Sequence, residues 1–166
     1  MKTGDPLLKC FIALALSCAV FVSVADAQST IFVVRHAEKA QGAGDDPDLS
    51  EAGRARAESL ATLLKDAAIS AIYSSEVKRT QQTASPLAKA LQLEPTIIPA
   101  KDRPALIAKL LGASGNVLVV GHSNTIPEII KALGVTDPVA IADNDYDNLF
   151  VVVPGEKPRL IHLHYR

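Results

Sequence analysis

The chain has 166 residues, a length that favours a single domain. Its net charge at pH 7 is -1, so it lacks the basic excess of general nucleic-acid-binding proteins, and we expect no nucleic-acid partner. Aromatic residues make up 4% of the chain and Trp is absent, which predicts a core of Val, Ile, Leu and Ala.

The N-terminal segment has the pattern of a secretory signal peptide. Lys2 and Lys9 precede a continuous apolar run over residues 10–24, and a small-x-small triplet follows, ending at Ala27. We therefore predict a signal peptide over residues 1–27, cut after Ala27. The apolar run is shorter than the roughly 20 residues of a membrane-spanning helix, although an uncleaved membrane anchor is the alternative.

Cleavage would leave a mature domain over residues 28–166, secreted or periplasmic and without stable membrane insertion. Both cysteines, Cys10 and Cys18, lie in the predicted signal segment. The mature domain would then contain no thiol, which excludes disulfides, cysteine nucleophiles and Cys-ligated metals. A protein without free thiols suits an oxidising compartment.

Strand and helix patterns alternate along the rest of the chain. Short apolar runs predict strands at Ile31–Val34, Ala71–Tyr73, Thr96–Ile98, Val117–Val120, Leu149–Val153 and Leu160–Leu163. Apolar residues at helical spacing predict helices at Ser50–Asp66, Glu76–Leu91, Asp102–Leu111 and Asn124–Leu133. Ser50 is the expected N-cap of the first helix, and Pro86 should kink or break the second.

This alternation predicts an α/β fold, a three-layer sandwich whose mainly parallel central sheet carries helices on both faces. The last two strands are joined by a short segment that begins with Pro154-Gly155, a turn signal. We therefore expect them to form a C-terminal antiparallel hairpin.

Three polar motifs each follow a predicted strand. Arg35-His36 follows the first strand, Arg79 lies in the segment after the second, and His122 follows the fourth. The carboxyl ends of parallel strands meet at one sheet edge, where ligands bind in α/β proteins. Two arginines and two histidines beside helix amino ends favour a doubly charged oxyanion such as phosphate, which the planar guanidinium binds through two oxygens.

The same residues indicate a mechanism. A neutral imidazole is a competent nucleophile, and the cations Arg35 and Arg79 disfavour protonation of His36. They also offset the negative charge of a phosphoryl-transfer transition state. A metal site would need histidines and carboxylates without adjacent cations, so we expect no metal and no cofactor.

The motifs resemble those of the histidine phosphatase superfamily, which has the phosphoglycerate-mutase-like fold. The chain is similar in particular to the compact, phosphohistidine-phosphatase-type members. The resemblance rests on four segments in order: Arg35-His36-Ala37-Glu38, with Ala37 in place of the family's Gly; Leu49-Ser50-Glu51-Ala52-Gly53; the stretch from Ser74 to Ala84, with Arg79-Thr80 and Thr83; and Gly121-His122-Ser123-Asn124.

The resemblance implies a role for each matching residue. His36 would be the nucleophile that becomes phosphorylated, and Arg35, Arg79 and His122 would form the catalytic phosphate pocket. Ser123 or Asn124 would add a hydrogen bond to the substrate.

The general acid is where the chain departs from the family. Many members carry an Asp directly after the second His, or a Glu in a long insertion, whereas Ser123 follows His122 here and the insertion is short. Asp102 is the best-placed carboxylate, and an N-cap role for it is the alternative. Asp143, Asp145 and Asp147 form an acidic loop that would approach the site rim, order the loop or select substrate.

These observations predict an exported phosphatase that hydrolyses a phosphate monoester or phosphoramidate through a phosphohistidine intermediate on His36. The substrate would be a phosphorylated small molecule or cell-envelope component. One alternative is a non-catalytic phosphate- or phosphoglycan-binding module on the same fold. A phosphoglycerate mutase-like phosphotransferase is less favoured, because the insertion that shapes such a pocket is missing.

Overall fold

The computed structural model describes residues 29–42 and 44–166, so the predicted signal peptide and both cysteines lie outside the described residues. The described chain forms one six-stranded sheet, in the order β3-β2-β4-β1-β5-β6. Its strands are β1 (Ile31–Arg35), β2 (Ile69–Ser74), β3 (Thr96–Ile97), β4 (Asn116–Gly121), β5 (Asn148–Val153) and β6 (Arg159–His164). The first four strands run parallel to one another, while β5 is antiparallel to β1 and β6 is antiparallel to β5. The predicted parallel sheet and C-terminal hairpin are confirmed.

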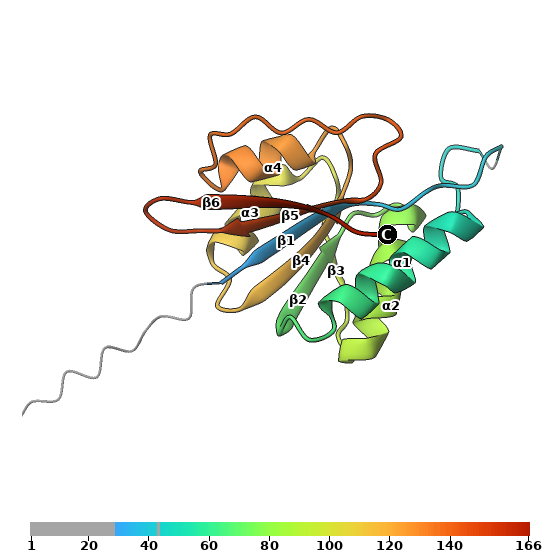
Figure 1. Ribbon diagram of the computed structural model, residues 1–166, viewed down its shortest axis with the longest axis horizontal. Helices are drawn as coiled ribbons and strands as arrows, with labels where there is room; N and C mark the ends of the chain where they lie inside the picture. Colours follow the sequence, from blue (N-terminus) through green and yellow to red (C-terminus); the bar gives the residue numbers. More distant parts are fainter. Residues whose placement is uncertain (1–28, 43) are drawn as a thin grey trace, which may run out of the picture.

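Helices cover both faces of this sheet, as predicted (Figure 1). They are α1 (Glu51–Leu64), α2 (Lys78–Leu91), α3 (Arg103–Leu111) and α4 (Ile126–Ala132). Helices α1 and α2 share one apolar core with the sheet, and α3 and α4 share a second core on the opposite face. Both cores are almost entirely aliphatic, with Phe150 and Tyr165 as their buried aromatic residues.

The first helix has the predicted cap, and the starts of two others differ from prediction. The Ser50 side chain accepts a hydrogen bond from the Gly53 amide at 3.1 Å and begins α1, as predicted. Helix α2 begins at Lys78 rather than at Glu76, and α4 begins at Ile126 rather than at Asn124. Pro86 lies inside α2, and the helix continues through it to Leu91.

Gly53 lets α1 approach the end of β1. A Cβ atom at this position would overlap the backbone carbonyl of Glu38. The amide of Ser50 donates to that same carbonyl oxygen at 2.8 Å. The Leu-Ser-Glu-Ala-Gly motif therefore ties the start of α1 to the segment that follows β1, which carries His36.

Among residues 29–42 and 44–166, no helix combines the length and apolar character that crossing a membrane requires.

Candidate active site

The pairing of β1 with β4 brings the two motif histidines side by side. Arg35 is in register with Gly121 in this parallel pair, and the His36 amide donates to the Gly121 carbonyl at 3.0 Å. His36 and His122 each follow the last position of their strand. Their ring centroids lie 5.4 Å apart in an edge-to-face arrangement.

The backbone fixes the tautomer of His36. Its Nδ1 atom lies 2.8 Å from the carbonyl oxygen of Ala37. A carbonyl oxygen can only accept, so Nδ1 carries the proton and the neutral ring has its lone pair on Nε2. This leaves Nε2 free for nucleophilic attack.

The surroundings keep that lone pair available. His36 is 5% exposed, and burial is the largest of the effects that lower its pKa from 6.5 to about 4. The hydrogen bond to Ala37 acts in the opposite direction, while the charges of Arg79, His122 and Arg35 lower the pKa further. The ring is therefore neutral throughout the physiological pH range.

Both motif arginines keep a buried donor without a partner. The Nε atoms of Arg35 and Arg79 form no hydrogen bond with any described residue. The Arg79 side chain also forms an ion pair of 3.8 Å between its Nη1 and the Asp46 carboxylate. A buried unsatisfied donor costs about 1–3 kcal/mol, so a bound oxyanion would gain by accepting from these groups.

Arg35 also anchors the acidic loop before β5. Its Nη1 donates to the backbone carbonyls of Ala142 at 2.9 Å, Asp143 at 2.9 Å and Asp145 at 3.3 Å. Its guanidinium carbon lies 4.2 Å from the centroid of the Tyr146 ring. Arg35 is predicted to bind phosphate, and one of its guanidinium nitrogens, Nη1, thus holds this loop beside the site.

Tyr146 forms a side wall of the site. Its ring centroid lies 6.0 Å from that of His36, and the residue is half-buried. Tyr146 therefore lies against both Arg35 and His36.

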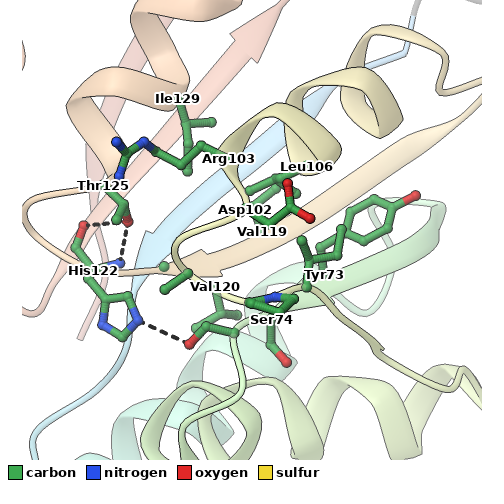
Figure 2. A pocket seen from close by; sticks show the side chains of 15 residues that line it. Tyr73, Ser74, Asp102, Arg103, Leu106, Val119, Val120, His122, Thr125 and Ile129 are labelled. Atoms are coloured by element: carbon green, nitrogen blue, oxygen red, sulfur yellow. Dashed lines mark hydrogen bonds between the residues drawn. The ribbon is translucent and has the colours of Figure 1, made fainter.

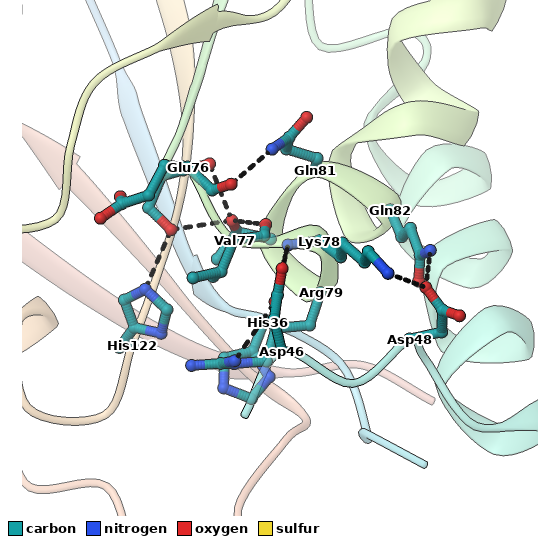
Figure 3. A network of polar contacts seen from close by, with 12 residues as sticks. His36, Asp46, Asp48, Glu76, Val77, Lys78, Arg79, Gln81, Gln82 and His122 are labelled. Carbon is teal, nitrogen blue, oxygen red and sulfur yellow. Dashed lines mark hydrogen bonds and ion pairs between the residues drawn. The ribbon is translucent and has the colours of Figure 1, made fainter. Parts of the chain in front are cut away.

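Two buried threonines of α2 link the helix to the strand ends. Thr83 Oγ1 accepts from the Ala37 amide at 2.9 Å and donates to the Arg79 carbonyl at 2.7 Å. Thr80 Oγ1 contacts Ser75 Oγ at 2.9 Å, and Ser75 Oγ contacts His122 Nε2 at 3.0 Å (Figure 3). Both threonines are 0% exposed. Thr83 of the Arg-Thr-x-x-Thr motif therefore holds the backbone next to His36, and Thr80 holds His122 through Ser75.

The turn after His122 is stabilised by Thr125. Its Oγ1 accepts from the His122 amide at 3.1 Å and lies 3.2 Å from the His122 carbonyl oxygen (Figure 2). Ser123 is half-buried and Asn124 is exposed. Neither side chain forms a hydrogen bond in the part of the chain that the structure describes, so their predicted contact with substrate remains a prediction.

Asp102 caps α3. Its carboxylate accepts from the Ala105 amide at 3.2 Å. It also lines a cavity of about 30 Å³, lined too by His122, Leu106 and Ile98 and large enough for about one water molecule (Figure 2). The N-cap alternative is thus realised, and a role as general acid remains a prediction.

The other carboxylates near the site are held in place by hydrogen bonds. Arg56 forms a bidentate pair with Glu38, with contacts of 2.7–2.9 Å. Burial acts to raise the pKa of Glu38, but these bonds outweigh it and lower the pKa. Glu76 accepts from the Ala100 amide at 2.8 Å, which lowers its pKa in turn. Both groups are ionised and ill-suited to donate a proton.

The acidic residues before β5 have local partners. Asp145 accepts from the Ala142 amide at 3.0 Å, and Asp147 contacts His164 at 3.2 Å. His162 contacts Asn148 at 2.7 Å. These bonds order the loop and the last hairpin.

No three His, Asp, Glu or Cys side chains within the described ranges lie close enough together to hold a metal ion.

Sequence reasoning missed Tyr146, Ser75, Thr80, Thr83 and Thr125. A signal was present for the threonines, because Thr80 and Thr83 belong to the motif that identifies Arg79. For Tyr146 the signal was weak: an aromatic residue stands alone in an acidic loop, in a chain that is 4% aromatic.

Comparisons with known proteins agree with this geometry. The model of a family described as the histidine phosphatase superfamily (branch 1) matches residues 31–101, which hold the first three motifs. No curated protein sequence matches the chain.

Solved structures share the fold. One from Agrobacterium tumefaciens, described as a "putative phosphohistidine phosphatase SixA", is 27% identical with a TM-score of 0.63, covering 82% of this chain and 98% of that one. A "putative alpha-ribazole-5'-P phosphatase" from Escherichia coli is 18% identical with a TM-score of 0.65, covering 82% and 96%. A mycobacterial glucosyl-3-phosphoglycerate phosphatase is 16% identical with a TM-score of 0.63, covering 82% and 98%.

The near-complete coverage of the Agrobacterium structure places the chain beside a compact member of the group. Together with the matched family segment and the order of the motifs on this fold, it supports the histidine phosphatase superfamily as the family of this chain.

Proposed function

We propose that this protein is an exported phosphatase that hydrolyses a phosphate monoester or a phosphoramidate through a phosphohistidine intermediate on His36. The observation that carries the proposal is the state of His36. Its Nδ1 proton is held by the Ala37 carbonyl, and its Nε2 lone pair lies in a pocket with two arginines. The family and its phosphatase neighbours support phosphatase activity in general.

The first step forms a bond between His36 Nε2 and phosphorus while the bond from phosphorus to the leaving oxygen or nitrogen breaks. The leaving group departs with the bonding electrons and takes up a proton from water. The charges of Arg35 and Arg79 offset the negative oxygens of the transferring group. The Ala37 carbonyl supports the positive charge that His36 gains, because it accepts from Nδ1.

In the second step, water attacks phosphorus and the bond between Nε2 and phosphorus breaks. Inorganic phosphate leaves, the proton of the attacking water is released, and His36 returns to its neutral form. The low pKa of His36 favours this return, because the free ring does not hold a second proton at neutral pH.

The lowered pKa values of Glu38 and Glu76 favour substrates whose leaving group needs no proton from a carboxylic acid of the site. A phosphoramidate meets this requirement because its nitrogen is basic, and an aryl phosphate meets it because phenolate is a stable anion. A proton donor with a raised pKa would be needed for simple alkyl phosphates.

The test is turnover of an aryl phosphate and a phosphoramidate by the domain over residues 28–166, beside its His36→Ala variant. We expect turnover that disappears in the variant. Phosphate binding without turnover of either compound would favour the phosphate-binding module instead. Turnover that survives His36→Ala would contradict the mechanism.

Export is supported by the charge and hydropathy pattern of residues 1–27. Expression of the full chain in a bacterial host should give a periplasmic product whose N-terminal residue is Gln28. Intact mass spectrometry of the fractionated protein measures this, and an uncut, membrane-bound product would show that the segment is an anchor.

A further inference from the structure

A chain of hydrogen bonds behind His122 ends on the backbone of the segment before α2. Thr80 Oγ1 lies 2.8 Å from the Val77 carbonyl oxygen and 3.1 Å from that of Ser75. Ser75 Oγ lies 2.9 Å from Thr80 Oγ1 and 3.0 Å from His122 Nε2. Thr80 is 0% exposed and Ser75 is 5% exposed, so both hydroxyl-bearing residues are buried.

The direction of each hydrogen bond follows from the end of the chain. A carbonyl oxygen only accepts, so the single hydroxyl proton of Thr80 points to the backbone. The Thr80 oxygen then accepts the hydroxyl proton of Ser75. With its proton committed, the Ser75 oxygen accepts from His122, and Nε2 of His122 must carry a proton.

The two histidines of the site are thus held in opposite tautomers. His36 carries its proton on Nδ1, facing the Ala37 carbonyl, whereas His122 carries its proton on Nε2, facing Ser75. Figure 3 shows the second ring nitrogen of His122 turned toward the side of the site where His36 and Arg79 lie. In the neutral state both rings direct a lone pair into the phosphate pocket.

A lone pair on His122 Nδ1 repels a phosphoryl oxygen, whereas a protonated Nδ1 donates to it. We propose that Ser75 and Thr80 are positioning residues that keep His122 protonated on Nε2, so that His122 takes up a proton on Nδ1 when a phosphoryl dianion binds. This inference rests on the proposed function of the pocket.

The charged groups around His122 agree with this cycle. Burial lowers the pKa of His122, the charges of Arg79 and Arg35 lower it further, and Glu76 acts in the opposite direction. On the α3 side, Asp102 and Arg103 line the cavity beside the ring, and Arg103 is paired with Glu128 at 2.7 Å. The free ring is therefore neutral at neutral pH, and a bound dianion beside it reverses the balance.

Proton uptake makes oxyanion affinity depend on pH. Between the pKa of free His122 and its higher pKa in the complex, the dissociation constant should rise up to about tenfold for each unit of increasing pH. His36 also has a lone pair in the pocket, so the measurement belongs in a His36→Ala background, where His122 is the one remaining histidine of the pocket.

Sulfate is a suitable probe because it does not titrate near neutral pH. Isothermal titration calorimetry of sulfate binding, in buffers of different ionisation enthalpy, reports the number of protons taken up. We expect uptake approaching one proton per sulfate in the His36→Ala variant. Adding His122→Ala should abolish it.

Thr80→Val and Thr80→Ser test the relay in the same background. Valine removes the acceptor for the Ser75 proton, which then turns to His122 Nε2 and favours the tautomer with its proton on Nδ1. That tautomer donates to sulfate directly, so proton uptake should fall and the pH dependence should flatten. Serine keeps the hydroxyl and should restore both.

Nitrogen-15 NMR of the imidazoles in the free wild-type protein gives an independent reading that needs no variant to fold. We expect the protonated nitrogen to be Nε2 in His122 and Nδ1 in His36. The same tautomer in both rings would overturn the inference.

Sulfate binding without proton uptake, or uptake unchanged by Thr80→Val, would also overturn the inference and leave the proposed function standing. Wild-type protein that neither binds an oxyanion nor turns over either phosphoryl compound would refute the proposed function itself, and the inference with it.

Discussion

The neutral state of His36 has a measurable effect on stability. Burial first, and then the neighbouring charges of Arg79, His122 and Arg35, lower its pKa from 6.5 to about 4 in the folded protein. In the unfolded chain the ring recovers its ordinary pKa near 6.5. As pH falls from 6.5 to 4, the unfolded chain therefore binds a proton that the folded protein does not bind, and stability decreases.

The size of this effect follows from the pKa difference. A pKa difference of about 2.5 units corresponds to a loss of about 3 kcal/mol in the free energy of unfolding. The loss is complete below pH 4 and absent above pH 6.5. His36→Asn removes the titrating group. The stability of the wild type relative to this variant should therefore be constant above pH 6.5 and should decline by about 3 kcal/mol on the way to pH 4.

Urea unfolding of both proteins at a series of pH values measures this difference, provided that the denaturant slopes agree. A wild-type-minus-variant difference that stays flat between pH 7 and pH 4 would show that His36 protonates freely in the fold. In that case the nucleophile would not be held neutral by its surroundings, and this part of the account would be refuted.

Three further predictions concern the frame of the site. Gly53→Ala should destabilise the fold by about 1–3 kcal/mol in urea unfolding, because its methyl group meets the Glu38 carbonyl, whereas Gly112→Ala has ordinary contacts and should change stability by less than about 0.5 kcal/mol. Asp102→Asn keeps the cap of α3, so an N-cap role predicts unchanged stability and kcat; a kcat that falls far more for an alkyl than for an aryl phosphate would instead identify a general acid. Arg35→Lys should lower kcat/KM by about tenfold or more and speed amide exchange in the acidic loop, because an ammonium group cannot reproduce the contacts of the guanidinium, while Tyr146→Phe should retain both properties; slow exchange in Arg35→Lys would show that the loop is held by other contacts.

The sheet could be predicted almost completely from sequence because its signals are local. Each buried strand is an apolar run between turn residues, and each helix repeats apolar residues at helical spacing. The starts of α2 and α4 were predicted two residues too early, because residues 76–77 and 124–125 belong to the turns that follow Ser75 and His122. The break predicted as one outcome at Pro86 does not occur, because α2 packs against the sheet and α1 and continues through this residue.

The site could be predicted in part. His36 and His122 come together because parallel strands place their carboxyl ends at one edge, a rule that needs no coordinates. The second role of Arg35 could not be predicted, because the loop that it anchors lies more than a hundred residues away in the sequence. The position of Tyr146 could not be predicted either. An aromatic residue in a loop has no periodic pattern that would indicate which strand end it contacts.

We expect His36 Nε2 to carry the phosphoryl group during turnover. Rapid quench of the reaction at alkaline pH, which preserves phosphohistidine, followed by peptide mass spectrometry and phosphorus NMR, tests it directly. The expected result is a phosphoryl group on His36, bonded to Nε2 because Nδ1 is held by the Ala37 carbonyl, and no such group in His36→Ala. A phosphoryl group on another residue or on Nδ1 of His36, or turnover with no trapped intermediate under conditions where its hydrolysis is rate-limiting, would contradict the account.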